Sequence, residues 1–322
     1  MFLRRKVQIR LIAAQLQAKT TVTTANKNMT GILIKAISGF YYVSCDSAVY
    51  ECKARGNFRK TGISPVVGDT VEFTCTDNTH GVIESVLPRK NILKRPLVAN
   101  IDKLFIVSAY ATPSPDTVMI DRLTALAVYN GIEPVIVFNK ADMGSFEQFY
   151  RIYTNAGFKT FVVSAKDNLG LEQLKAEIDG CVCAFSGNSG VGKSSILNAM
   201  FSELELKTGE VSEKLGRGRH TTRHTELFSA GNGFVVDTPG FSSVENDDDL
   251  YNFKISLADC FPEFSEYIGK CKFTSCSHIN EKGCAVLDAV NCGKIEKSRH
   301  KSYVALSEEL KDVSQWNSKQ KK

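Results

Sequence analysis

The clearest candidate for a functional site in this sequence is a glycine-rich loop that ends in a lysine and a serine. Glycines let backbone N–H groups turn inward around phosphates, while the lysine reaches the outer phosphates and the serine ligates Mg²⁺. The loop follows the apolar run 181–185 and precedes a helical period, which is the context such a loop requires. We predict nucleotide contacts from Gly187, Asn188, Ser189, Gly190, Val191, Gly192, Lys193, Ser194 and Ser195, with Lys193 also catalytic.

A second phosphate element is predicted at Asp237-Thr238-Pro239-Gly240, directly after the apolar run 233–236. A carboxylate at the end of a strand can hold Mg²⁺ through water, and the glycine N–H can meet a γ-phosphate. The tetrapeptide alone is equally consistent with an ordinary turn. Together with Lys193 it predicts that Asp237 and Gly240 belong to the nucleotide site.

Base recognition is predicted from Asn139-Lys140-Ala141-Asp142, which follows the apolar run 134–138. The Asp142 carboxylate can accept hydrogen bonds from N1–H and the 2-amino group of guanine, donors that adenine does not present there. About one helix later, Ser164-Ala165-Lys166 can supply a backbone N–H for the base oxygen. These residues predict a preference for guanine nucleotides.

The Cys and His residues near the C-terminus have the spacing of a metal site. Cys271, Cys276, His278 and Cys284 follow the pattern C-x4-C-x-H-x5-C. A Cys₃His set fills all four positions of tetrahedral Zn²⁺ and leaves none for an activated water. We predict one structural zinc that stabilises a small module. The remaining cysteines are interpreted as plain thiols: Cys45, Cys52, Cys75, Cys181, Cys183, Cys260 and Cys292.

Three kinds of segment are expected to position these residues. Short β-rich runs punctuated by glycines predict a small all-β barrel or sandwich between Gly31 and about Pro88. From Ile101 onward, apolar strands alternate with helical periods, which is typical of a parallel sheet. After about Leu250 the cysteines cluster and the chain becomes helical and charged. The predicted division is an extension at 1–28, a barrel at 29–98, a nucleotide-binding domain at 99–249 and a zinc-binding helical module at 250–322.

The order of the motifs is unusual, because the base-recognition segments precede the phosphate loop. A circular permutation leaves a parallel sheet intact when the original termini were close. The nucleotide site is then expected at the carboxyl ends of the strands, as in other α/β folds.

The chain resembles the circularly permuted GTPases of the RsgA (YjeQ) family from about Met29 to its last helix. The resemblance rests on the motif order, on residues 216–222 (Gly-Arg-Gly-Arg-His-Thr-Thr), on 237–241 and on the Cys-His cluster. It implies an N-terminal OB-fold, a permuted GTPase domain and a C-terminal zinc module. It also implies that the small ribosomal subunit and its rRNA are partners, and that the activity assists late maturation of that subunit.

The resemblance also points to the residues of the switch segment. Thr222 looks like the switch threonine that meets Mg²⁺ in the GTP state, with Thr221 as the alternative. Phe241 stands where Ras-like enzymes have the glutamine that orients the attacking water. We therefore predict that His220 positions the water, which makes hydrolysis slow until a partner orders the segment. Contact of His220 with rRNA or solvent is the other interpretation.

Composition sets only loose limits on function. The formal net charge of +5 permits a polyanionic partner without requiring one. No apolar run reaches the length of about 18 residues that a membrane span needs, so we expect a soluble protein. We further expect it to be cytoplasmic and monomeric. The basic segment before Met29 is open to three interpretations: a disordered extension or upstream start, which we favour, a transit peptide, or a signal peptide.

The barrel and the C-terminus each offer candidate RNA contacts, with burial in the barrel core as the more common role of strand aromatics and a solvated helix face as an equal alternative at the C-terminus. The barrel candidates are Tyr41, Tyr42, Arg55, Arg59 and Lys60, and the C-terminal candidates are Lys294, Lys297, Arg299, Lys301, Lys311 and the tail lysines. The sequence predicts a GTPase that binds the small (30S) subunit, with Mg²⁺ and Zn²⁺ as cofactors, and times its own release by hydrolysis. A nucleotide-gated RNA-binding protein with little turnover and a GTPase of another assembly or trafficking pathway remain open alternatives.

Overall fold

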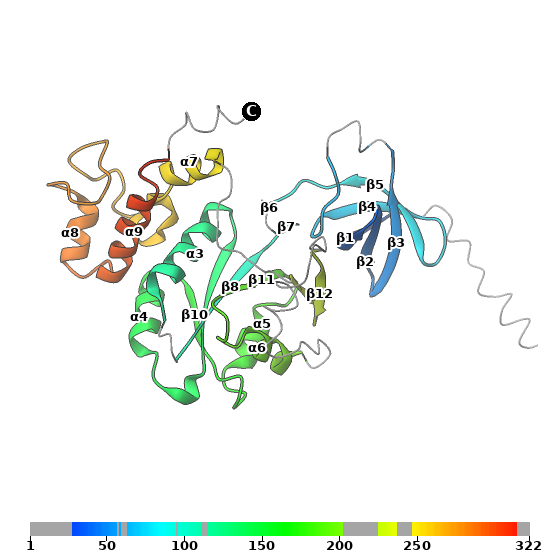
Figure 1. Cartoon of the computed structure of the whole chain (residues 1–322), viewed down its shortest axis with the longest axis horizontal. Coiled ribbons are helices and arrows are strands. Elements are labelled where there is room, and N and C mark those ends of the chain that lie inside the picture. Colours follow the sequence, from blue (N-terminus) through cyan, green and yellow to red (C-terminus); the bar gives the residue numbers. More distant parts are fainter. Residues whose placement is uncertain are drawn as a thin grey trace, which may run out of the picture. The chain divides into compact units, whose positions relative to one another are not determined.

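The computed structural model describes residues 28–56, 58, 63–94, 96–110, 115–201, 225–236 and 247–313. These residues form two compact units. The first, which we call the barrel unit, comprises the described residues up to Pro65 together with Thr70–Leu87. The second, which we call the sheet unit, comprises Val66–Asp69 and the described residues from Pro88 onward. Each unit is described separately below, and the ribbon of both is drawn in Figure 1.

The barrel unit is a closed five-stranded barrel. Its strands are β1 (Asn28–Ile37), β2 (Phe40–Cys45), β3 (Ala48–Ala54), β4 (Thr70–Cys75) and β5 (His80–Val86). They pair in the order β1-β2-β3-β5-β4, with β1 returning to β4 and β3 parallel to β5. Alternate residues such as Val71 and Phe73 point into the core, as expected for half-buried strands. This closed five-stranded arrangement is that of an OB-fold and confirms the predicted class of the N-terminal domain.

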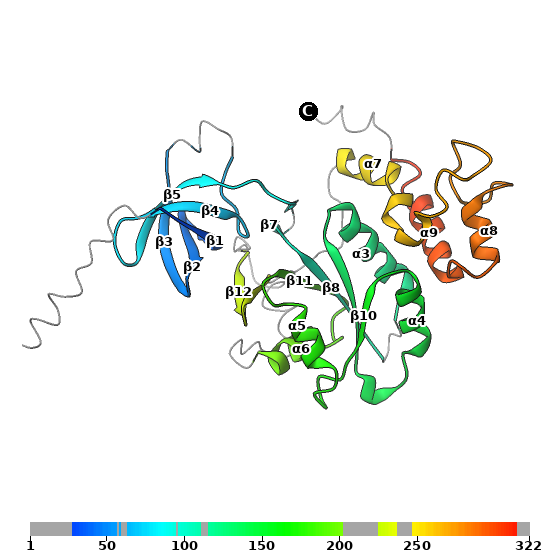
Figure 2. The ribbon, with the colours of Figure 1, turned by 180° about the vertical axis from the view of Figure 1, so that it is seen from behind.

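The sheet unit is built on six strands in the order β10-β9-β8-β11-β13-β12. They are β8 (Lys103–Ala109), β9 (Glu133–Asn139), β10 (Lys159–Val162), β11 (Val182–Ser186), β12 (Leu227–Ala230) and β13 (Gly233–Val236). All neighbours are parallel except β12 and β13. Figure 2 shows the sheet from behind, with β12, β11, β8 and β10 following one another across the view. A short hairpin, β6 (Ile92–Lys94) and β7 (Leu97–Ala99), precedes the sheet.

Helices cover both faces of this sheet. Helices α5 (Leu171–Ala176) and α6 (Lys193–Met200) pack against side chains such as Phe105 and Val135. Helices α3 (Thr117–Tyr129) and α4 (Glu147–Asn155) contact β8, β9 and β10. The central strand β8 is buried almost throughout, which is typical of a parallel strand covered on both sides. The predicted α/β nucleotide-binding domain is thereby confirmed.

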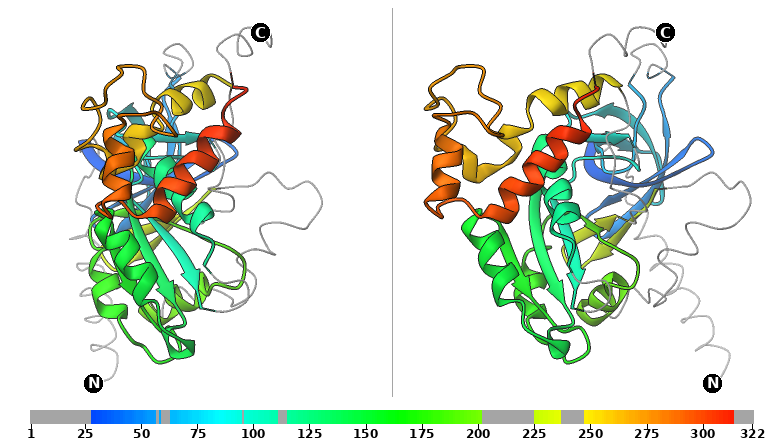
Figure 3. Two further views of the ribbon diagram at one scale, coloured as in Figure 1. Left: turned by 90° about the vertical axis from the view of Figure 1, so that its left-hand side faces the viewer. Right: turned by 60° about the vertical axis from the view of Figure 1, so that its left-hand side comes forward.

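The C-terminal part of the sheet unit is helical. It contains α7 (Asp247–Ile255), the short helices η3 (Ala258–Cys260) and η4 (Pro262–Phe264), α8 (Ala285–Asn291) and α9 (Lys297–Glu309). Helix α9 contacts α3, and Figure 3 shows it in red beside that helix. A shared core joins Ala125 and Leu126 of α3 to Phe261, Phe264 and Leu306 of this helical part, with other residues. None of the helices in the described part of the chain combines the length and apolar character that crossing a bilayer requires.

Candidate guanine-nucleotide and metal sites

The phosphate loop lies between β11 and α6, as predicted, and its backbone depends on glycine. Gly187 has φ +143°, and a Cβ there would lie 2.1 Å from the Val107 oxygen. Gly192 has φ +93°, and its Cβ would lie 2.3 Å from the Asn139 Nδ2 atom. Because side chains at these positions would collide with β8 and with Asn139, the loop can pack this closely only with glycine.

Lys193 begins α6 and is the positive group of the loop. Its ammonium donates to the carbonyl oxygens of Gly187 (2.7 Å) and Asn188 (3.1 Å). Burial lowers the pKa of Lys193, and none of the ion pairs found among the described residues includes it. A partly desolvated cation without a counter-anion is suited to an anionic ligand. Ser194, the predicted Mg²⁺ ligand, follows in the first turn of α6 and is buried.

Asn139 joins the base-recognition segments to the phosphate loop. It is the last residue of β9 and is only 2% exposed. Its Nδ2 group donates to the Val191 oxygen (2.9 Å), and its Oδ1 atom accepts from the Ala165 N–H (3.2 Å). The neighbouring Lys140, which has φ +65°, donates to the Gly190 oxygen (2.9 Å). Three segments that are far apart in the sequence therefore meet at the carboxyl edge of the sheet.

Asp142 lies in the short helix η1 (Ala141–Met143) and faces the Ser164-Ala165-Lys166 segment. One of its carboxylate oxygens accepts from the Ser164 hydroxyl (3.0 Å), and the other lies 3.7 Å from the Lys166 ammonium. Ser164 is fully buried, and its hydroxyl proton can alternatively be donated to Asp167 (3.2 Å). The Asp142 carboxylate is thus held by two partners, and its side chain is 17% exposed.

Several predicted site residues lie outside the described residues. They are His220, Thr221, Thr222, Asp237, Gly240 and Phe241, together with Arg59 and Lys60 of the barrel. Their roles stay predictions.

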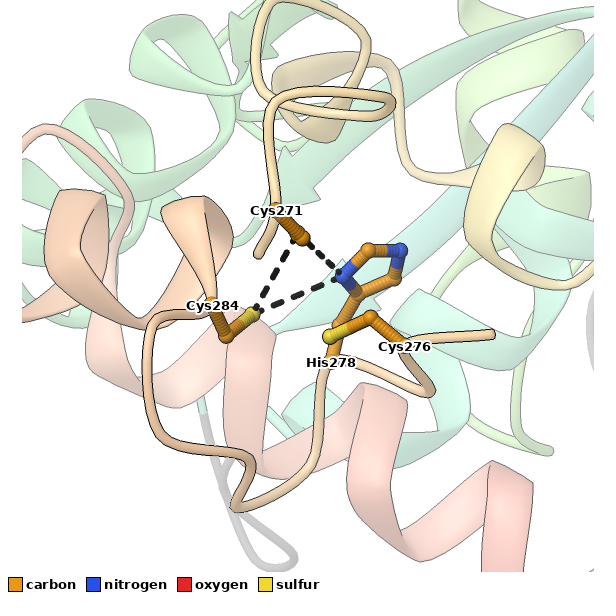
Figure 4. A group of neighbouring side chains, drawn as sticks. All are labelled: Cys271, Cys276, His278 and Cys284. Atoms are coloured by element: carbon orange, nitrogen blue, oxygen red, sulfur yellow. Dashed lines mark hydrogen bonds between the residues drawn. The ribbon is translucent and has the colours of Figure 1, made fainter. Parts of the chain in front are cut away.

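The four predicted zinc ligands lie together (Figure 4). Their donor atoms are all within 4.8 Å of one another. The Cys271 and Cys284 sulfurs are 3.9 Å apart, and each lies 3.5 Å from the His278 Nδ1 atom. A tetrahedral zinc site places two sulfurs about 3.8 Å apart and a sulfur and a nitrogen about 3.6 Å apart. Three of the four donor atoms therefore lie at the spacings of a tetrahedral zinc site, and the Cys276 sulfur lies within 4.8 Å of them.

Without a metal, the protein environment favours the neutral forms of both the thiol and the imidazole ligands. Burial, together with hydrogen bonds to the Cys284 and Cys271 thiols, raises the pKa of the Cys276 thiol to about 12, although a backbone hydrogen bond at His278 acts to lower it. Burial lowers the pKa of His278, so that the neutral imidazole, which is the form that binds metals, is favoured at neutral pH. A bound cation would stabilise the thiolates, and its binding would release protons.

Comparison with models of known protein families shows to which family this chain belongs. The family model described as RsgA GTPase matches residues 86–247, and the RsgA N-terminal domain model matches residues 30–83. The chain belongs to the RsgA family of GTPases.

Curated relatives in this family match along nearly their whole length. The protein described as "Small ribosomal subunit biogenesis GTPase RsgA" from Geobacillus sp. (strain WCH70) is 44% identical over 291 residues, covering 88% of this chain and 97% of that protein. A protein of the same description from Clostridium novyi (strain NT) is 44% identical over 285 residues, covering 88% and 97% of the two chains.

Solved structures agree with the sequence relatives. YjeQ from Thermotoga maritima has a TM-score of 0.75 and 33% identity, covering 89% of this chain and 100% of that chain. YloQ, described as a circularly permuted GTPase, has a TM-score of 0.74 and 32% identity, covering 89% and 96%. Membership of the RsgA family establishes GTP hydrolysis as the activity of this protein and Mg²⁺ as the cofactor that accompanies GTP.

The prediction that Arg299, in the C-terminal helical part, contacts rRNA is wrong. Arg299 of α9 has 0% side-chain exposure and forms ion pairs with Asp121 (2.7 Å) and Glu263 (2.7 Å). Because the guanidinium is enclosed by carboxylates and aromatic rings, it cannot reach rRNA. In the barrel, Tyr42 donates to Glu51 (3.0 Å) and Arg55 pairs with Glu84 (2.8 Å), while both remain partly accessible.

Three residues around the zinc ligands were not predicted. The Glu281 carboxylate accepts from the backbone N–H groups of Ser277 (2.8 Å), Ile279 (2.9 Å) and Asn280 (3.1 Å), and so fixes the loop that carries His278. On α9, Tyr303 donates to the Ser277 oxygen (2.7 Å), and His300 lies 2.8 Å from the His278 oxygen. The position of Glu281 between the ligands His278 and Cys284 was the one feature of the sequence that pointed to it. No feature of the sequence pointed to His300 or Tyr303.

Proposed function

We propose that this protein binds the small ribosomal subunit, assists its late maturation and uses GTP hydrolysis to time its release. The observation that supports the proposal is the junction at Asn139, where one side chain links the predicted base-recognition segments to the phosphate loop. The descriptions of the curated relatives support the small subunit as the partner. We further propose that the protein acts as a monomer in the cytoplasm.

We propose the following roles at the nucleotide site. Asp142 accepts from the guanine base, and Lys193 neutralises charge on the β- and γ-phosphates. Ser194, Thr222 and Asp237 hold Mg²⁺, directly or through water. The remaining residues of the three segments contribute backbone groups to the base and the phosphates. The division of the chain at residues 29, 99 and 250 is retained as part of this proposal.

His220 is proposed to position the attacking water, because Phe241 can neither accept nor donate a hydrogen bond. The neutral imidazole can hold a water through its acceptor nitrogen. His220→Ala should leave GTP affinity unchanged and remove most of the rate increase caused by small subunits. Stimulation that survives this substitution, with subunit binding intact, would show that another residue or rRNA supplies the missing group.

Co-sedimentation with isolated small subunits tests the proposal as a whole. The protein should pellet with small subunits in the presence of a non-hydrolysable GTP analogue and stay in the supernatant with GDP. Large subunits serve as the control. Equal pelleting in the two nucleotide states would refute release by hydrolysis, and absence of pelleting in both would refute the partner.

A further inference from the structure

Arg299 is the largest of the fully buried charged side chains among the described residues, and the nucleotide chemistry above does not use it. Its Nη1 group donates to Asp121 of α3 (2.7 Å) and to Thr124 (3.2 Å). Its Nε and Nη2 groups donate to Glu263 at 2.7 and 3.2 Å. One cation therefore connects α9 and η4 of the zinc module with α3 of the GTPase fold.

Aromatic rings complete this enclosure. The guanidinium carbon lies 4.6 Å from the ring centre of Phe261, 5.1 Å from Phe158 and 5.9 Å from Tyr153. The hydroxyls of Tyr153 and Ser302 lie near the Asp121 carboxylate without reaching hydrogen-bond geometry, so Asp121 Oδ2 has no hydrogen-bond partner among the described residues. Buried ion clusters of this kind add little stability, and their best-attested use is to fix one arrangement of the parts they join.

Tyr153 connects this cluster to the base-recognition strand. It lies on α4 with 0% exposure, and its ring centre is 5.9 Å from that of Phe138 on β9. Phe138 is fully buried and also stacks on Phe146 at 5.0 Å. The next residue in β9 is Asn139, which holds both Val191 and Ala165. Tyr153 and Phe138, here called the aromatic relay, thus connect Arg299 to the junction of the nucleotide site.

We propose that Arg299 is a positioning residue for guanine-nucleotide binding, acting through the aromatic relay on Asn139. The proposal rests on the nucleotide site proposed above. Displacement of a binding group by about 1 Å is enough to change function markedly, and a packed chain of rings transmits such a shift because it cannot be compressed. The zinc module would thereby set the affinity of the distant guanine site.

The decisive measurement is the Kd for a fluorescent GDP analogue, together with KM and kcat for GTP, in the full-length protein without ribosomes. Arg299→Lys keeps the charge but loses the fork that holds both carboxylates. Tyr153→Leu leaves the ion pairs in place but removes the ring of the relay. Each should raise Kd and KM about tenfold, a typical coupling between distant sites, and leave kcat at saturating GTP unchanged.

Two matched variants separate positioning from simple destabilisation. Tyr153→Phe keeps the ring and loses only the hydroxyl, so its Kd should equal that of the unmodified protein. Leu306→Ala opens the core of the same module on the same helix, away from the relay, and should lower the melting temperature without changing Kd. The double variant Arg299→Lys/Tyr153→Leu should bind no more weakly than either single variant, because both interrupt one path.

The proposal is overturned if Tyr153→Leu binds GDP as tightly as the unmodified protein, or if Leu306→Ala weakens binding as much as Tyr153→Leu does. Additive losses in the double variant would also overturn it. If Arg299→Lys does not fold, Tyr153→Leu and Tyr153→Phe decide the question. Failure of the nucleotide assignment is distinguishable, because the unmodified protein itself would then show no guanine-specific Kd.

Discussion

The nucleotide site and the zinc site lie in one unit and hold their residues in opposite ways. At the zinc site, three sulfurs and one imidazole nitrogen converge on one point, and the protein fills every position around it. At the nucleotide site, side chains such as Asn139 and Lys140 bind backbone carbonyls and shape a cradle, while Lys193 has no carboxylate beside it among the described residues. A closed donor set suits a permanent structural ion, and a cradle whose cation has no carboxylate partner among the described residues suits a ligand that exchanges.

Removal of a zinc ligand should have the largest effect on free energy. Structural zinc binding contributes roughly 10–16 kcal/mol of apparent free energy to small metal-dependent modules. Cys276→Ala should therefore lose the one zinc per chain and unfold the helices of the module, as measured by metal analysis and limited proteolysis. Cys292→Ala, which removes an exposed thiol outside the donor set, is the control. A folded, metal-free protein that is indifferent to Cys276→Ala would contradict the structural role.

Removal of the Lys193 ammonium should abolish GTP hydrolysis without unfolding the protein. Lys193→Ala should lower the GTP hydrolysis rate by about 10³-fold or more, because charge on the transferring phosphoryl group is then uncompensated. Ser194→Ala should abolish hydrolysis as well, through Mg²⁺. Lys175→Ala removes the same charge from α5, where the ammonium lies 5.1 Å from the Phe201 ring, and should be silent. Normal turnover in Lys193→Ala or Ser194→Ala would refute the role assigned to that residue.

Substitution of the base-reading carboxylate should change specificity rather than turnover. Asp142→Asn should weaken GTP binding by about 10²-fold and favour xanthine nucleotides, whose 2-oxo group accepts from an amide. Asp167→Asn is a matched control, because Asp167 also accepts from Ser164 (3.2 Å) but has no predicted contact with the base. Competition binding with GTP, xanthosine triphosphate and ATP measures the effect. Equal affinity of the unmodified protein for ATP and GTP would end the argument for Asp142.

The smallest effect is expected at Glu281, which supports the zinc loop without touching the metal. Burial alone would raise its pKa, but hydrogen bonds from Ser277 and the loop backbone lower it to about 2. This stabilisation is complete above the ordinary carboxyl pKa and would be lost only as pH falls toward 2, so it is fully present at neutral pH. Glu281→Gln should lower the free energy of unfolding by about 1–2 kcal/mol at pH 7.5 while zinc stays bound. Lys282→Gln, which changes an exposed neighbour, is the control. If Glu281→Gln and the unmodified protein have the same melting temperature, Glu281 does not stabilise the zinc loop.

The sequence predicted the elements whose chemistry is local. Residue type and spacing alone were sufficient to predict loop 187–194, the tetrapeptide 139–142 and the four zinc ligands. The structure brings the residues of each set together. Arg299 shows where such prediction ends. In the sequence it is one cation of a charged helix, and its partners Asp121 and Glu263 lie 178 and 36 residues away. Only the packing of α9 on α3 decides that this cation faces inward.

The most direct test of the account is multiple-turnover GTP hydrolysis by the unmodified protein, with and without isolated small ribosomal subunits. Hydrolysis should be slow alone and accelerated by small subunits, with no comparable hydrolysis of ATP. A rate with GTP that is the same in the presence and absence of small subunits, under conditions where the protein binds them, would contradict it.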